Sequence, residues 1–98
     1  MNFNDLNIFI NIYETGSLNQ SAVNLGYAQS NLTARLKNLE SEMCTRLFIR
    51  KYNGIVPTRS GDKLYYFAKE TLQNFEIMQK ELISQGKSIL ISELLLNY

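Results

Sequence analysis

Apolar residues recur every three or four positions at the start of the chain, which is the spacing of one face of a helix. This stripe consists of Leu6, Phe9, Ile10 and Tyr13. Asn2 or Asn4 can cap the start of the predicted helix, and Gly16 can end it in the left-handed conformation. The pattern therefore predicts a first amphipathic helix that ends near Gly16.

Two further helices are predicted after short connections. Ser17 is followed three residues later by Gln20, which predicts a capping box at the start of a second helix that ends at Gly26. The inward face of that helix consists of Leu18, Ala22 and Leu25. A third helix is predicted from about Gln29 to Met43, and its apolar face consists of Leu32, Leu36, Leu39 and Met43.

The period of the pattern then changes from that of a helix to that of a strand. Leu47-Phe48-Ile49 and Ile55-Val56 flank Tyr52-Asn53-Gly54, and Asn-Gly between apolar runs predicts a β-hairpin. Thr58 can cap a long fourth helix that reaches about residue 85. The apolar residues that recur along it are Leu64, Ala68, Leu72, Phe75, Met78 and Leu82.

Residues 18–37 meet the packing requirements of a helix-turn-helix. Ala22 is small where the two helices cross, and Gly26 tolerates the positive φ of the tight turn. The apolar residues that hold the second helix of the motif down are Leu25, Leu32 and Leu36. The predicted fold class is mainly α, with three helices, a two-stranded hairpin and a long final helix.

The net charge of the 98-residue chain is only +1, which taken alone argues against a nucleic-acid partner. The charge is unevenly distributed, however. Residues 1–34 carry a net charge of −2, residues 35–63 carry +4 and residues 64–98 carry −1. The positive charge therefore lies on the third helix, the hairpin and the start of the fourth helix, where a phosphate-binding surface is expected.

Composition excludes several other classes of protein. One domain is expected from 98 residues, and no apolar run reaches the length of a membrane span, so a cytoplasmic protein with no membrane partner is expected. The chain lacks histidine, a metal-binding cluster and a Gly-rich phosphate loop. We therefore expect no enzymatic activity, no cofactor and no metal site. Cys44, the single cysteine, is interpreted as an inert, partly buried thiol, with a redox switch as the alternative.

The polar face of the third helix carries the side chains that are candidates for DNA contact. They are Gln29, Ser30, Asn31, Thr33, Arg35 and Lys37. The Gln29 amide suits adenine, Ser30 and Thr33 can reach a base edge or a phosphate, and at least one of Arg35 and Lys37 should reach a phosphate. The hairpin adds Arg50, Lys51 and Asn53 beside the minor groove, whereas Arg46 and Arg59 are interpreted as surface charge.

Over about residues 1–90 the chain resembles the LysR-type bacterial transcriptional regulators. The matching stretches are Leu6-x-x-Phe9, Gly16-Ser17-Leu18, Ala22-x-x-Leu25, Gln29 to Glu40, Leu47-Phe48-x-Arg50 and Thr58-x-x-Gly61. The resemblance implies a winged helix-turn-helix in residues 1–58, with helix 29–43 for recognition and residues 47–57 as the wing. It also implies that 59–87 is a linker helix that dimerises, and that 88–98 is a tail or the start of a missing effector domain. The partners implied are promoter or operator DNA, a second copy of the chain and, only in a full-length form, a small-molecule effector.

Four positions depart from the pattern of this family. Ala28 stands where the family commonly has a serine or threonine cap, and Ala34 stands where many members have a DNA-contacting arginine. Ser30 replaces a common proline, which is a mild change. Cys44 occupies a position that is usually glycine, so it must accept a positive φ or end the helix differently.

The long fourth helix would expose an apolar stripe in a monomer, which is unfavourable. We therefore expect a dimer that buries Leu64, Ala68, Leu72, Phe75, Met78 and Leu82. A second interpretation, from a different class, is a truncated protein–protein interaction module that heterodimerises with a full-length regulator. DNA titrations at several salt concentrations distinguish the two, because only phosphate contacts give a steep salt dependence.

Overall fold

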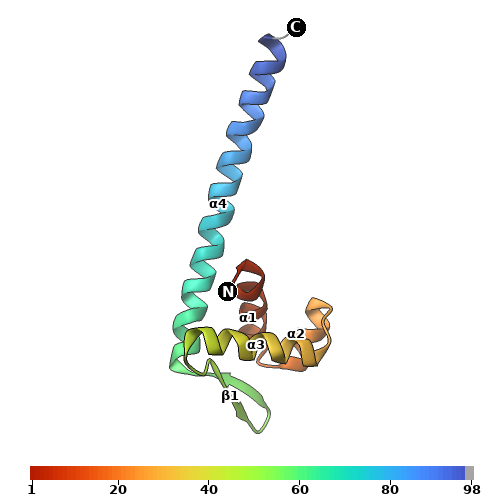
Figure 1. Cartoon of the computed structure of the whole chain (residues 1–98), viewed down its shortest axis with the longest axis vertical. Helices are drawn as coiled ribbons and strands as arrows, with labels where there is room; N and C mark the ends of the chain where they lie inside the picture. Colours follow the sequence, from red (N-terminus) through yellow and green to blue (C-terminus); the bar gives the residue numbers. More distant parts are fainter. Residues whose placement is uncertain (97–98) are drawn as a thin grey trace.

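Four helices and one hairpin make up the part of the chain that the structure describes. The computed structural model describes the backbone of residues 1–96 and the side chains of residues 1–86. The helices are α1 (Phe3–Thr15), α2 (Leu18–Leu25), α3 (Gln29–Met43) and α4 (Arg59–Leu96), and the strands are β1 (Phe48–Lys51) and β2 (Gly54–Pro57). Figure 1 shows α1 to α3 and the hairpin grouped at one end of α4, which extends far beyond them. The predicted order of elements is confirmed.

The starts of the first two helices follow local capping rules. The Asn2 side chain accepts the backbone N–H of Asp5, and the Asp5 carboxylate accepts that of Asn2, so α1 has a complete capping box. Ser17 caps α2 by accepting the backbone N–H of Gln20 at 3.1 Å. The capping box predicted there is only half formed, because the Gln20 amide donates instead to Asn24, one turn further along.

Three helices end on a left-handed residue, and one of these residues is not glycine. Gly16 ends α1 with φ 65°. Gly26 ends α2 with φ 72°, as the tight turn of the helix-turn-helix requires. Cys44 ends α3 with φ 55° and accepts the strained conformation. Its thiol is exposed, so the interpretation of Cys44 as partly buried is wrong. At the other end of α3, Ala28 provides no side-chain cap, as predicted.

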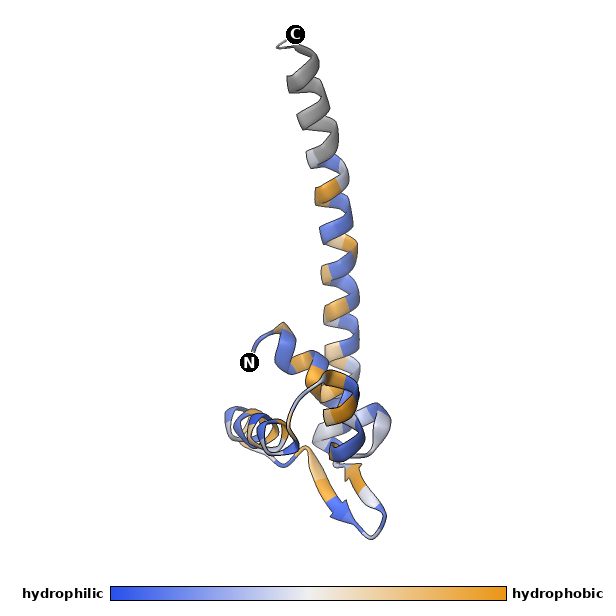
Figure 2. Cartoon of the chain, turned by 90° about the vertical axis from the view of Figure 1, so that its right-hand side faces the viewer, coloured by the Kyte–Doolittle hydropathy of each residue, from blue (hydrophilic) through white to orange (hydrophobic). Residues whose placement is uncertain are grey.

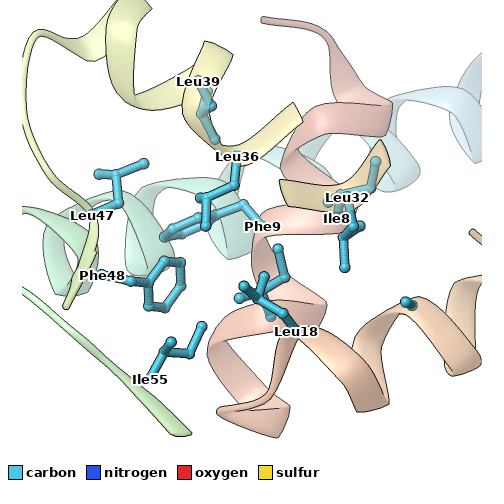
Figure 3. Packing of buried hydrophobic residues seen from close by; sticks show 11 residues of the cluster. Ile8, Phe9, Leu18, Leu32, Leu36, Leu39, Leu47, Phe48 and Ile55 are labelled. Carbon is cyan, nitrogen blue, oxygen red and sulfur yellow. The ribbon is translucent and has the colours of Figure 1, made fainter. Parts of the chain in front are cut away.

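The hydrophobic core lies where α1, α2, α3 and the hairpin converge. Figure 3 shows Phe9 of α1, Leu18 of α2, Leu36 of α3 and Phe48 of β1 pointing toward a common centre. The Phe9 and Phe48 rings lie 5.4 Å apart. The core therefore joins the hairpin to the helix-turn-helix and fixes the position of both relative to α1.

Hydrogen bonds to other parts of the domain hold both strands of the hairpin in place. The backbone N–H of Ile55 donates to the carbonyl oxygen of Gly16, in the connection between α1 and α2. The Glu40 carboxylate of α3 accepts the backbone N–H of Leu47 at 2.6 Å and that of Phe48 at 3.4 Å. An added Cβ on Gly54 would lie 2.7 Å from the Gly16 carbonyl oxygen, so only glycine fits there. The root of the hairpin is thus bonded to α3, and the start of β2, next to the turn, is bonded to the connection between α1 and α2.

Helix α4 continues beyond its predicted end near residue 85. Its backbone is helical as far as Leu96, so residues 88–96 continue α4 and do not form the separate tail that was one of the two alternatives for 88–98. Asn97 and Tyr98 lie outside the described residues. The described chain measures 67 Å along its longest axis because of this helix. None of the helices in residues 1–96 combines the length and hydrophobicity that a membrane span requires.

The apolar stripe of α4 is divided between two environments. Its first part packs on α1 of the same chain: Ala68 is fully buried, and the Phe75 ring lies 4.6 Å from that of Phe3. Ala68 is therefore unavailable to a partner chain, which corrects part of the predicted dimer seam. Beyond α1 the stripe is exposed at Met78 and Leu82, and Figure 2 shows apolar positions continuing along the projecting part of α4.

Candidate nucleic-acid interface

The polar face of α3 is exposed because its apolar face is fully used in the core. Leu32, Leu36 and Leu39 are buried, and Ser30, Ala34 and Lys37 on the opposite face are open to solvent. Ala34 has only a methyl group, so it cannot form a hydrogen bond with a base or a phosphate. The polar groups of this face therefore come from the residues around Ala34.

Two neighbouring grooves join α3 to the hairpin. The first runs between α3 and β1, and Thr33, Lys37 and Arg50 line it together with core residues. The second runs past the start of α2 and of α3 to the hairpin, and its lining includes Gln29, Arg50 and Lys51. Arg50 lines both grooves. The structure thus brings together five of the nine predicted contact residues, from two segments of the chain.

Of the cations that line these grooves, only Arg46 has an acidic partner in the described part of the chain. The ion pairs there involve the Met1 amine, Arg35, Arg46 and Lys69. Lys37, Arg50 and Lys51 are exposed and form none of them. The grooves therefore carry an uncompensated positive charge on a surface that combines a helix with a hairpin.

Thr33 has a defined hydrogen-bond state. Its hydroxyl donates to the backbone carbonyl of Gln29, one turn earlier, at 2.9 Å. The donor is thereby used within the helix, which leaves the oxygen lone pairs and the methyl group for other contacts. A threonine in this state suits an apolar contact with the methyl group of thymine or an acceptor role toward a base amino group.

Four predicted contact residues lie outside the two grooves. Ser30, Asn31 and Asn53 are exposed but line neither groove. Arg35 points instead toward α1, where its guanidinium lies 3.4 Å from the Asp5 carboxylate and 5.4 Å from the centre of the Tyr27 ring. These two partners hold Arg35 against the body of the domain.

Arg46 is also engaged within the chain. Its guanidinium lies 3.5 Å from the Glu40 carboxylate and donates to the backbone carbonyl of Phe48. Arg59, at the start of α4, is exposed and lines neither groove. Both placements agree with the interpretation of these two residues as surface charge.

Three residues that line the second groove were not predicted from the sequence. Ser17 and Asn19 at the start of α2 line the second groove with Gln29, and Tyr52 lines it from the hairpin turn. Tyr52 is the most exposed large hydrophobic side chain among the described residues, with a relative exposure of 101%. Its position in the turn next to Asn-Gly could have identified it, because side chains at a hairpin tip project away from the core.

Comparisons with known proteins agree on one type of domain. Residues 3–62 match the family described as "Bacterial regulatory helix-turn-helix protein, lysR family". The HTH-type transcriptional regulator CzcR of Bacillus cereus is 38% identical over 80 residues, which cover 82% of this chain and 28% of that protein. The HTH-type transcriptional regulator YofA of Bacillus subtilis is also 38% identical over 80 residues, with 82% and 28% covered.

Solved structures with the same fold include complexes with DNA. The BenM DNA-binding domain bound to catB site 1 DNA matches with a TM-score of 0.77 and 29% identity, over 82% of this chain and 89% of that one. The CbnR DNA-binding domain in complex with DNA matches with a TM-score of 0.83 over 88% and 99%, although at 24% identity it supports the fold alone. The chain spans about 28% of the length of the curated relatives it matches.

Proposed function

Because the chain belongs to the LysR family of bacterial regulatory helix-turn-helix proteins, we propose that it binds specific sites in double-stranded promoter or operator DNA and thereby regulates transcription. One observation carries the proposal: α3 and the hairpin form a single surface, and the cations Lys37, Arg50 and Lys51, which have no ion-pair partner among the described residues, lie along its grooves. An α-helix fits the major groove, and the hairpin then lies beside the adjacent minor groove.

The groove residues divide by chemistry into base readers and phosphate binders. Gln29, in the first turn of α3, is placed to pair its amide with adenine, and Thr33 lies one turn further along the same face. Lys37, Arg50 and Lys51 carry the charge that phosphates require. Tyr52 at the tip of the hairpin would touch the minor groove or its rim. Ser30, Asn31 and Asn53 stay in the proposal as exposed residues beside these groups.

A second copy of the chain completes the proposed site. Met78 and Leu82 form an apolar strip on α4 that nothing in the described chain covers. Phe67 continues this strip to a groove that Met1 and Phe3 line, at and just before the start of α1. We propose that α4 of a second copy packs on this strip. Two copies would present two α3 helices to two half-sites and would double the positive charge that faces DNA.

The rest of the proposal concerns a longer protein and its location. The curated relatives are more than three times as long as the matched segment, so a small-molecule effector belongs to a full-length form in this proposal. Its place of action is the cytoplasm, where it associates with the nucleoid when it is bound to DNA. We expect no enzymatic activity from the domain itself.

Titration of DNA at several salt concentrations tests the proposed function. The probe is a duplex selected from a random-sequence library by the purified protein, and binding is followed by fluorescence anisotropy. If three cations from each of two copies contact phosphates, the logarithm of the association constant should fall with the logarithm of the salt concentration with a slope of about −5. The absence of binding to any duplex at low salt would contradict the proposal and favour the protein–protein module.

Sedimentation tests the proposed dimer. The wild-type chain is expected to sediment as a dimer at tens of micromolar, because the strip on α4 is otherwise exposed. The variant Met78→Glu/Leu82→Glu should be a monomer at the same concentration, since it places two charges in the seam. Gln73→Glu is the matched control, because Gln73 is exposed on the same helix away from the strip. A wild-type monomer, or a dimer that the double variant leaves intact, would show that the seam lies elsewhere.

A further inference from the structure

Helices α1 and α4 pack side by side in opposite directions and are fastened at two places. At one end the rings of Phe3 and Phe75 lie 4.6 Å apart. At the other end Tyr13 and Tyr65 stack with 3.8 Å between ring centres and 7° between ring planes. These contacts lie in the first half of α4, and the rest of the helix projects beyond them, as Figure 1 shows.

The stacked tyrosines are joined by a reciprocal pair of hydrogen bonds. The Tyr13 hydroxyl of α1 donates to the Asp62 carboxylate of α4 at 2.8 Å. The Tyr65 hydroxyl of α4 donates to the Glu14 carboxylate of α1 at 2.6 Å. Lys69 of α4 lies 3.6 Å from the same Glu14 oxygen. Each helix thus supplies one hydroxyl and one carboxylate to the other, and we call Tyr13, Glu14, Asp62 and Tyr65 the tyrosine clamp.

Both hydroxyls of the clamp stay protonated over the range in which proteins fold. The hydrogen bond to Asp62, with a smaller contribution from burial, raises the pKa of Tyr13 to about 12. The hydrogen bond to Glu14 raises the pKa of Tyr65 in the same way. Both hydroxyls therefore keep the protons that they donate to Asp62 and Glu14 at neutral pH.

The geometry of the clamp restricts the angle between α4 and the rest of the domain. Stacked rings alone can slide over each other at little cost, because dispersion attraction has no strong directional preference. Hydrogen bonds to carboxylates are directional and charge-assisted, and here they run in both directions between the helices. A swing of α4 that slides the rings must break at least one of them.

We propose that the tyrosine clamp sets the separation of half-sites that the dimer accepts. This inference rests on the proposed function, because it needs two copies joined through α4. In such a dimer the distance between the two α3 helices depends on the angle of each domain to α4. One base-pair step is about 3.4 Å along the duplex, so a loss of angular restraint that moves α3 by a few ångströms changes the preferred spacing.

The first measurement follows the angle in one chain and needs no DNA. Cys44 is exposed at the end of α3, and Ser84→Cys adds a second exposed thiol on the projecting part of α4. Spin labels on the two thiols, in chains diluted with unlabelled protein, report the distance distribution between α3 and α4. The distribution should be narrow in the parent chain and at least about twofold wider in Tyr13→Phe/Tyr65→Phe, which keeps both rings but removes both hydrogen bonds.

The second measurement follows spacing on DNA. The selected duplex is remade with one or two base pairs added to or removed from the spacer. The wild-type chain should lose about tenfold or more in affinity at the changed spacings, whereas the double variant should lose less than about threefold. Tyr66→Phe is the matched control, because Tyr66 is exposed and outside both hydrogen bonds, and it should behave as the wild type in both measurements.

The possible outcomes separate this inference from the proposed function. The inference would be overturned if the double variant and the wild type gave the same distribution of distances between the spin labels and the same dependence of affinity on half-site spacing. The single variants Tyr13→Phe and Tyr65→Phe each keep one hydrogen bond, so each must give an intermediate width, and a width equal to that of the wild type in both would also overturn it. A wild-type chain that binds no duplex while the double variant widens the distribution contradicts the proposed function and leaves the mechanical role of the clamp supported.

Discussion

The variant Gly61→Ala is expected to lose about 3–5 kcal/mol of unfolding free energy, which is a large part of the total stability of a small domain. Gly61 is buried in the first turn of α4, and an added Cβ would overlap the backbone carbonyl oxygen of Leu47. The same Cβ would lie 3.2 Å from the Pro57 Cβ. The carbonyl of Leu47 cannot move away freely, because it accepts the backbone N–H of Thr58 at 2.9 Å.

Urea unfolding followed by circular dichroism measures this effect, and Gly86→Ala is the matched control. Both glycines lie in α4, but no atom lies within 4 Å of a Cβ added at Gly86. Alanine should therefore raise stability there by about 0.5–1 kcal/mol, because it lowers the entropy cost of forming the helix. Equal urea midpoints for Gly61→Ala and the wild type would contradict the prediction, because they would show that α4 can move away from the root of the hairpin without loss of stability.

The variant Arg50→Ala is expected to weaken DNA binding by about tenfold or more and to make the salt slope shallower by about 0.9 for each copy that contacts DNA. Arg50 lines both grooves of the interface, and it has no ion-pair partner in the described part of the chain. Its guanidinium is therefore available to DNA without first breaking an ion pair within the protein. Anisotropy titrations at several salt concentrations give both quantities.

Arg35→Ala is the matched control for Arg50→Ala, because it removes the same charge from the same positively charged segment. Arg35 is held by Asp5 and Tyr27, so we expect a loss of less than about threefold in affinity and an unchanged salt slope. Similar losses for the two variants would mean that Arg35 leaves Asp5 and contacts DNA, as the sequence pattern alone predicts. Thermal unfolding of both variants checks that neither change acts through stability.

Features with local causes could be read directly from the sequence. Helix periodicity and the caps at Ser17, Gly16 and Gly26 depend on residues within a few positions of each other, so they placed the first three helices. The end of α3 at Cys44 also has a local cause, because Cys44 follows the last residue of the apolar stripe. It adopts a positive φ, which is one of the two alternatives predicted for it. The hairpin followed from Asn-Gly between two apolar runs.

Features with distant partners could not be predicted in this way. Arg35 lies on a polar face in the sequence, but its partner Asp5 is 30 residues away. Ala68 belongs to a regular apolar stripe, and periodicity does not tell whether α1 or a second chain covers it. The tyrosine clamp joins residues 49 and 51 positions apart, so neither of its hydrogen bonds leaves a trace in the local pattern.

The hairpin separates the residues that maintain the fold from those that face a ligand. Leu47 and Phe48 at its root are bonded to Glu40, and Ile55 near the turn is bonded to Gly16, whereas the side chains of Lys51, Tyr52 and Asn53 are exposed. Changes of these three exposed side chains therefore cost the domain little stability, and changes at the bonded positions cost it much. A library made in the laboratory can therefore vary the proposed DNA contacts of the hairpin at three adjacent positions while the scaffold stays constant.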